Sequence, residues 1–395
     1  MTATLDRPVN AAPVAAAPVE QQITPLPSSL AGKVPTLEPS AAAHLSAEQL
    51  DALGAELDAL RAEVVASLGE ADAAYIHKVI RWQRGLEVGG RAALLFSLFP
   101  PAWLAGTAAL SVSKILDNME LGHNILHGQW DWMRDPKINS KAWEWDHSSP
   151  SEFWQKSHNY EHHTFTNVRG KDRDLGYAVM RITPEQEWRP TDLLQPVTNV
   201  LLSLFFEYAI TLYDLEFDRV VEGKKTWTEL RSQALTILRK GRKQWAKDFL
   251  LFPLLSGPGF LATLAANVTA GTVRNVWSHA VIFCGHFPDG TETFEEDRLE
   301  GETRGEWYVR QLLGSANLTG GPLFHLMTGN LSHQIEHHLF PDLPSNRYSQ
   351  IASRVQDICQ RYGLPYTAGP LPTQYAKVVK KIFRLALPGG GPKTA

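Results

Sequence analysis

The chain has 395 residues and a formal net charge of -4, a near-neutral balance that argues against a broad nucleic-acid-binding surface. Its two cysteines, Cys284 and Cys359, share no short motif, which excludes a disulfide framework, a cysteine-type zinc site and an iron–sulfur cluster. The chain is instead rich in histidine, with 14, and in tryptophan, with 12. Any metal chemistry must therefore rest mainly on histidine.

The N-terminal region divides into a tail and a helix. Residues 1–45 are rich in Ala and Pro, lack the basic lead-in of a secretory signal, and are predicted to be a disordered tail. An amphipathic helix is predicted over 46–72, because Ser46 and Gln49 fit a capping box and apolar residues follow at helical spacing. These apolar positions are Leu50, Leu53, Leu57, Leu60 and Val64. The helix either packs on the rest of the protein or binds a partner or a membrane surface.

Three apolar stretches follow. The first, Arg91–Lys114, is broken by Pro100-Pro101, which predicts two helices joined by a turn. The second, Leu193–Leu212, is the cleanest candidate for a membrane span and contains one ionisable residue, Glu207. Such residues are usually functional or paired, and the sequence assigns Glu207 no role. The third, Phe249–Phe287, is long enough for a second hairpin, with Pro and Gly residues near its start.

These stretches predict an all-α fold with about four membrane spans, arranged as two hairpins, within a domain over residues 73–380. Residues 381–395 are predicted to be a flexible tail. The basic residues between the second and third apolar stretches place that side in the cytoplasm by the positive-inside rule. The histidine motifs fall on the same side, so we expect a cytoplasmic helical cap that carries them.

Three histidine clusters dominate the motif content. They are His123-Asn-Ile-Leu-His127, His158-Asn-Tyr-Glu-His162-His163 and His333-Gln-Ile-Glu-His337-His338. On a helix, residues four apart lie on one face, so each pair of histidines projects toward a common point. At this histidine content the H-x-x-x-H-H pattern is expected by chance roughly 0.02 times, yet it occurs twice. The clusters together therefore predict a metal site.

The types of ligand limit which metals the site can bind. Imidazole-rich sites without thiolates suit zinc, copper, nickel or iron. Eight of the 14 histidines lie in the three clusters, more than one four-coordinate ion needs, so two metal ions are expected. A membrane location, two redox metals and an apolar substrate region together point to O₂ chemistry on a hydrocarbon.

At these residues the chain resembles the membrane fatty-acid desaturase family, which carries three histidine boxes. The resemblance rests on GHNILHGQWDW from Gly122, SHNYEHHTFTN from Ser157 and SHQIEHHLFP from Ser332. Within the family the chain looks most like the mycobacterial-type stearoyl-CoA Δ9-desaturases of actinobacteria. YVRQLLGSAN from Tyr308 and GGPLFHLMTGN from Gly320 add to that likeness.

The resemblance implies a set of metal ligands. The residues at the matching positions are His123, His127, His158, His162, His163, His337 and His338. In box three either Gln334, the family's usual position, or His333, which repeats the spacing of box two, faces the metal. A further ligand is expected from the preceding helix, where Gly285-His286-Phe287 favours His286 over His279.

Residues around the ligands are expected to support them. Asn275 and Asn330 are candidates to hold a metal-bound water. Glu161 and Glu336 precede the paired histidines and either orient imidazoles or are solvated carboxylates, and Asp172 and Asp174 after box two present the same alternative.

The resemblance implies an O₂-dependent enzyme that uses a di-iron centre, with iron as Fe²⁺, to place a cis double bond in stearoyl-CoA or palmitoyl-CoA, Δ9 being favoured. The electrons would come from an external NADPH-linked reductase or ferredoxin-type donor, because the chain carries neither a dinucleotide fingerprint nor a fused haem motif. We expect a multi-pass protein of the bacterial plasma membrane with a cytoplasmic active site. The alternatives are an acyl-lipid or front-end (linoleoyl-CoA-type) desaturase, a fatty-acid or alkane hydroxylase and, more remotely, a metal transporter.

Overall fold

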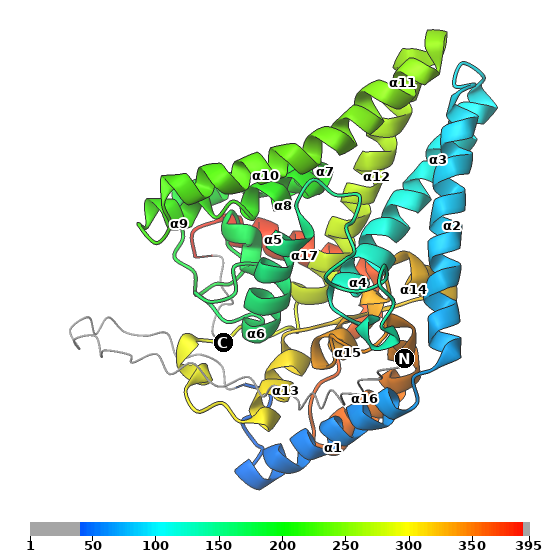
Figure 1. The fold of residues 1–395 in the computed structure, drawn as a ribbon. Coiled ribbons are helices and arrows are strands. Elements are labelled where there is room, and N and C mark those ends of the chain that lie inside the picture. The colour runs from blue at the N-terminus through cyan, green and yellow to red at the C-terminus, as the bar shows by residue number, and fades with distance from the viewer. Residues whose placement is uncertain (1–39, 390–395) are drawn as a thin grey trace, which may run out of the picture. The chain divides into compact units, whose positions relative to one another are not determined.

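Helices make up nearly all of the regular structure between residues 40 and 389, the part of the chain that this computed structural model describes (Figure 1). The α-helices of this part are α1 (Ala47–Ala66), α2 (Glu70–Leu94), α3 (Pro100–Leu116), α4 (Asn124–Leu126), α5 (Ser151–Trp154), α6 (His163–Phe165), α7 (Gln195–Leu204), α8 (Phe206–Tyr213), α9 (Phe217–Val221), α10 (Trp227–Trp245), α11 (Phe252–Leu255), α12 (Phe260–His286), α13 (Arg304–Leu313), α14 (Pro322–Met327), α15 (Gln334–Leu339), α16 (Tyr348–Arg361) and α17 (Leu371–Ala386).

The strands between residues 40 and 389 are a short parallel pair, β1 (Asn317–Thr319) and β2 (Ala368–Pro370), in which Asn317 pairs with Ala368. The all-helical architecture is therefore as predicted. The predicted N-terminal tail lies, up to residue 39, outside the described residues. Helix α17 continues to Ala386, beyond the boundary predicted at residue 380, because Ile382 and Leu385 on its inner face are buried.

The first helix begins where the sequence predicts. The Ser46 hydroxyl accepts a hydrogen bond from the Gln49 backbone N–H, and the Gln49 side chain accepts one from the Ser46 N–H at 2.9 Å. The predicted apolar face packs on α13, and Leu53, Leu57 and Leu60 are fully buried. Helix α1 ends at Ala66 rather than at residue 72, because the chain turns and starts α2 at Glu70.

Both predicted hairpins are present. Pro100 and Pro101 occupy the first turn of α3, where a missing N–H costs nothing, and the turn before them separates α2 from α3. The second hairpin joins α11 to α12 through a 3₁₀ turn, Gly257–Gly259. Helix α12 packs against α3, so the two hairpins lie together with their tips at one end, opposite α1, α13 and α16 (Figure 1).

The stretch predicted as the cleanest span, Leu193–Leu212, is not one straight helix. It is broken at Phe205, where the segments Pro190–Leu204 and Phe206–Val221 meet at a bend of 102°. The bend turns the buried face of α8 toward α12, where Glu207 forms an ion pair with Arg274. Taken one at a time, the helices between residues 40 and 389 all fall short of the length and hydropathy of a membrane crossing, and only this bent pair reaches them in combination.

Candidate metal centre

The three histidine boxes do not lie on ordinary α-helices throughout. His123 ends a π-helical segment, η1 (Asp117–His123), and His127 follows α4 directly. Box two occupies a second π-helical segment, η3 (Gln155–His162), before α6. Box three is carried by α15, after a 3₁₀ turn, η9 (Leu331–His333). Short π-helical segments are frequent at functional sites, because the wider turn re-aims side chains.

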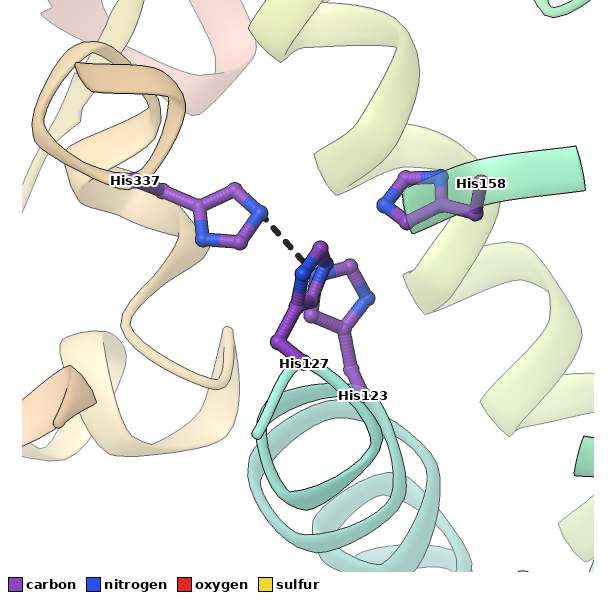
Figure 2. Close-up of side chains that lie close together, drawn as sticks. All are labelled: His123, His127, His158 and His337. Atoms are coloured by element: carbon purple, nitrogen blue, oxygen red, sulfur yellow. Dashed lines mark hydrogen bonds between the residues drawn. The ribbon is translucent and has the colours of Figure 1, made fainter. Parts of the chain in front are cut away.

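One set of four histidines converges from all three boxes. A ring nitrogen from each of His123, His127, His158 and His337 lies within 4.8 Å of the others. Figure 2 shows the rings turned toward one another, with 3.2 Å between the Nε2 atoms of His123 and His337. His123 and His337 are buried, whereas His127 and His158 are partly exposed.

A second set lies beside the first. His162, His286 and His338 form it, with 3.2 Å between the Nε2 atoms of His286 and His338. The Gln334 amide nitrogen approaches His286 Nε2 at 3.0 Å. This approach requires glycine at position 285, because a Cβ there would lie 2.9 Å from the Gln334 side chain.

His163 joins the two sets. Its ring stacks on His338 with centroids 4.3 Å apart and meets His127 of the other set edge-on at 4.6 Å. A narrow cavity is bordered by both sets, with His123 and His158 from the first and His162 and His286 from the second. Stretches more than 200 residues apart, such as His123 and His337, thus meet in one buried region, as the three-box pattern predicts.

The nitrogen atoms of these rings suit a metal. Within residues 40–389, buried nitrogens of His127, His158 and His163 find no hydrogen-bond partner. Unpaired buried polar atoms are costly unless something binds them. Burial, together with the neighbouring histidines, lowers the pKa of His123, His127, His163, His337 and His338 well below the ordinary value. Neutral imidazoles with free lone pairs are the form that binds transition metals.

Side chains behind the rings hold their Nδ1 atoms. Asp172 Oδ2 lies 2.9 Å from His162 Nδ1, and Asp174 Oδ2 lies 3.4 Å from His158 Nδ1. Burial alone would lower the pKa of His162, but the Asp172 carboxylate outweighs it and raises that pKa. Of the two alternatives for Asp172 and Asp174, the structure supports the orienting role, which leaves each Nε2 directed at the centre.

Further groups of this kind were not foreseen in the sequence, among them Tyr348 and Gln311. The Tyr348 hydroxyl lies 3.2 Å from His337 Nδ1, and Gln311 Oε1 lies 3.1 Å from His338 Nδ1. Gln311 lies within the YVRQLLGSAN stretch, but nothing in that pattern links it to a histidine 27 residues away. Only the fold brings these groups together.

Of the alternative box-three residues, the structure brings Gln334 to the histidines. His333 is turned aside, stacks on His325 with centroids 4.6 Å apart, and has its Nδ1 3.9 Å from Glu336. Similarly His286 joins a set, whereas His279 stacks on Phe283 with centroids 3.9 Å apart.

The remaining predicted residues are engaged elsewhere. Glu161 accepts a hydrogen bond from Arg219 at 2.6 Å, and Glu336 accepts from Asn317 and Tyr366, each at 2.8 Å. The hydrogen-bond partners of both carboxylates thus lie outside the two histidine sets. Asn275 accepts from the Arg274 Nε at 3.0 Å. Asn330 donates to Glu120 at 3.0 Å, so both amides are held outside the sets.

A cavity reaches the first set from the side of α8 and α12. His123 and His158 border it at one end. Its apolar lining comes from Met119, Trp154, Tyr177, Phe206, Ile210 and Ile282. Such a lining beside the histidines suits a hydrocarbon substrate.

Comparison with known proteins agrees with this geometry. A family model described as fatty acid desaturase matches residues 98–370. The NADPH-dependent stearoyl-CoA 9-desaturase of Mycobacterium tuberculosis is 47% identical over 350 residues, which cover 88% of this chain and 82% of that protein. The sn-1 linoleoyl-lipid 6-desaturase of Synechocystis is 27% identical over 68% of this chain and 76% of its own. Human fatty acid desaturase 3 is 24% identical over 73% and 63%, respectively. No solved structure matches the chain significantly.

Proposed function

Because this chain belongs to the fatty acid desaturase family, we propose that it places a cis double bond at the Δ9 position of stearoyl-CoA or a similar long-chain acyl-CoA. The relative from M. tuberculosis, whose name states this substrate and position, supports the proposal. The observation that carries it is the convergence of two histidine sets beside an apolar cavity.

The proposed cofactor is a pair of iron ions. Two adjacent sets of nitrogen donors, with unpaired buried nitrogens on His127 and His158 of the first set and on His163 beside both, support two metals. The family's oxidative reaction favours a redox metal over zinc. One ion would be held by the four-histidine set and the other by His162, His286 and His338, with His163 and Gln334 beside them. Iron would supply the activation of O₂ that removes hydrogen from an unactivated methylene.

The protein's own residues would hold the rings and the substrate in place. The Nδ1 contacts of Asp172, Asp174 and Tyr348 fix three of the imidazoles, so that little reorganisation is needed when the ions bind. The burial of the second set would limit the access of water to the metal there. The apolar cavity would present a fixed pair of methylenes to the metal side, which sets the bond position.

A membrane location is proposed for the hairpin tips. Phe96 and Phe99 at the α2–α3 tip are 70% and 62% exposed, and Leu255 and Leu261 at the other tip are 59% and 74% exposed. Large exposed apolar patches mark contact with a membrane or a partner. We place these tips in the bacterial plasma membrane, as about four spans in two hairpins, with the histidine sets on the cytoplasmic side.

The electrons are proposed to come from a separate NADPH-linked reductase or a ferredoxin-type carrier. The relative from M. tuberculosis is named as NADPH-dependent, and this chain lacks a dinucleotide-binding fingerprint of its own.

Fatty acids from a host that expresses the chain test this function. We expect a Δ9-monounsaturated product that is absent from the host alone and from a host that expresses His162→Ala, with labelled stearoyl-CoA converted in isolated membranes. A double bond formed only on glycerolipid acyl chains would transfer the proposal to the acyl-lipid desaturases. A hydroxylated product with no double bond would contradict it.

A further inference from the structure

Two cavities in the described part of the chain share one polar wall. The first is the apolar cavity that borders His123 and His158. The second lies farther along α12 toward the hairpin tips. Its lining combines Leu204, Phe205, Val268 and Gly271 with polar side chains, among them Lys114, Asp248 and Asn267. Glu207, Arg274 and Asn275 line both cavities. These three residues therefore stand between the space beside the histidines and the space beside the exposed apolar surface.

The wall is a closed network of polar contacts. Arg274 pairs with Glu207, and each side chain is 3% exposed. The Glu207 carboxylate also accepts hydrogen bonds from Gln244 at 2.8 Å and from the Ser148 N–H at 2.9 Å. On the other side, Asn275 donates to the Leu204 carbonyl at 2.9 Å. Every part of the wall is held by a neighbour.

Such a wall stops a hydrocarbon. An alkyl chain offers no hydrogen bonds, so pushing it through the network would leave a buried carboxylate and guanidinium without partners, which is strongly unfavourable. The lining of the first cavity combines apolar side chains such as Phe206, Ile210 and Ile282 with polar ones, among them Asn118, His147 and Ser157. On the side shared with the second cavity, the wall adds the buried Glu207–Arg274 ion pair. The buried ion pair between the two cavities marks where an acyl chain must end.

Resting on the proposed function, we propose that the Glu207–Arg274 pair is the floor of the acyl pocket. The methyl end of the substrate lies against it. The distance from this floor to the histidine sets then limits how many carbons extend beyond the new double bond. The pair thus determines the longest acyl chain that the enzyme accepts.

Space for a longer chain exists behind the floor. A Cβ added at Gly271, in the second cavity, meets no heavy atom within 4 Å among the described residues. The second cavity is bordered by Phe205 and Val268, which are 54% and 49% exposed. Opening the floor would join this space to the first cavity, and a larger side chain at Gly271 would fill it again.

The test uses the full chain in host membranes with its electron supply, given a mixture of palmitoyl-, stearoyl- and longer acyl-CoAs. In Glu207→Gln/Arg274→Ala the floor opens, while the glutamine still accepts from Ser148. We expect the ratio of longer desaturated products to stearoyl product to rise by about tenfold or more, the scale on which apolar pockets discriminate methylenes. Adding Gly271→Leu should reverse the rise, whereas Gly271→Leu alone should leave the product lengths unchanged.

A second variant works without removing the pair. Ile210 lines the first cavity one helical turn from Glu207, so Ile210→Phe should make the pocket shallower and shift products toward palmitoyl-derived ones.

The outcomes separate the alternatives. If the double variant loses activity equally for all chain lengths, or if its shift survives Gly271→Leu, the pair only joins α8 to α12 and the proposal fails. Unchanged product lengths in Ile210→Phe would also overturn it, even if the double variant does not fold. Absence of any desaturated product from the unaltered chain would instead refute the proposed function.

Discussion

Boxes two and three carry the same H-x-x-x-H-H spacing, yet they present different side chains to the centre. In box two, His158 and His162 both point inward, one to each histidine set. In box three His337 and His338 do the same, but the leading His333 is turned onto His325, and Gln334 faces the centre in its place. Identical spacing is therefore not sufficient for identical use.

The difference lies in the backbone before each box. Box two continues one helical segment, η3, from α5, so His158 lies on the inner face. Box three follows a tight turn at Gly329 and Asn330, both with positive φ, pressed against Met119 of η1. His333 has φ −102° and ψ 55°, and α15 begins only after it. A residue outside the helix does not share the helix's inner face.

The largest effect should come from His158→Ala. If His158 is a ligand, its loss removes one donor from the four-histidine set. We expect desaturation in isolated membranes to fall by more than the ~100-fold that loss of an outer-shell partner can cause. The protein level in the membrane fraction is the control. Activity within an order of magnitude of wild type would mean that His158, like His333, is not a metal ligand.

Asp172→Asn should have the next largest effect. The asparagine keeps the shape but removes the charge that favours a proton on His162 Nδ1. We expect activity and metal affinity to fall by about 10- to 100-fold. Iron content after dialysis against a graded chelator measures the affinity. The matched control is Asp131→Asn. Asp131 is an exposed carboxylate that accepts a hydrogen bond from the Ser140 hydroxyl, outside the histidine sets. Equal behaviour of the two variants would refute the orienting role.

Replacing the glutamate that precedes each histidine pair should destabilise the protein to different extents. Glu336 is fully buried and accepts from Asn317 and Tyr366 on its two oxygens, so Glu336→Gln misplaces one donor and should cost about 1–3 kcal/mol. Glu161 pairs with Arg219, whose side chain is 31% exposed, so Glu161→Gln should cost ~0.2–1 kcal/mol. Thermal unfolding in detergent compares them. A larger loss of stability for Glu161→Gln than for Glu336→Gln would contradict this prediction.

The smallest effect is expected for His333→Phe. The aromatic ring preserves the stack on His325, and the lost nitrogen lies outside both histidine sets. We expect activity and iron content close to wild type, measured beside Gln334→Ala, which should lower both. If His333→Phe loses iron and Gln334→Ala does not, His333 is the box-three ligand, as His158 is in box two.

Much of the site was predictable because its signals are local. Spacing identified the histidine boxes, and Pro100-Pro101 marked the first hairpin turn. The choice of Gln334 over His333 was not predictable, since it depends on the turn at Gly329. The bend at Phe205 lies next to Glu207, whose partner Arg274 is 67 residues away in the sequence. The orienting groups Gln311 and Tyr348 likewise act across the fold, where sequence spacing carries no information.

We propose that histidines from three distant stretches of the chain together hold two iron ions. Metal analysis of the purified full chain, loaded anaerobically with Fe²⁺ and freed of loosely bound metal, tests it most directly. We predict two irons per chain in the unaltered protein and in His333→Phe, and fewer than two in both His158→Ala and His338→Ala. A single iron per chain, or full occupancy retained in His158→Ala and His338→Ala, would contradict the account.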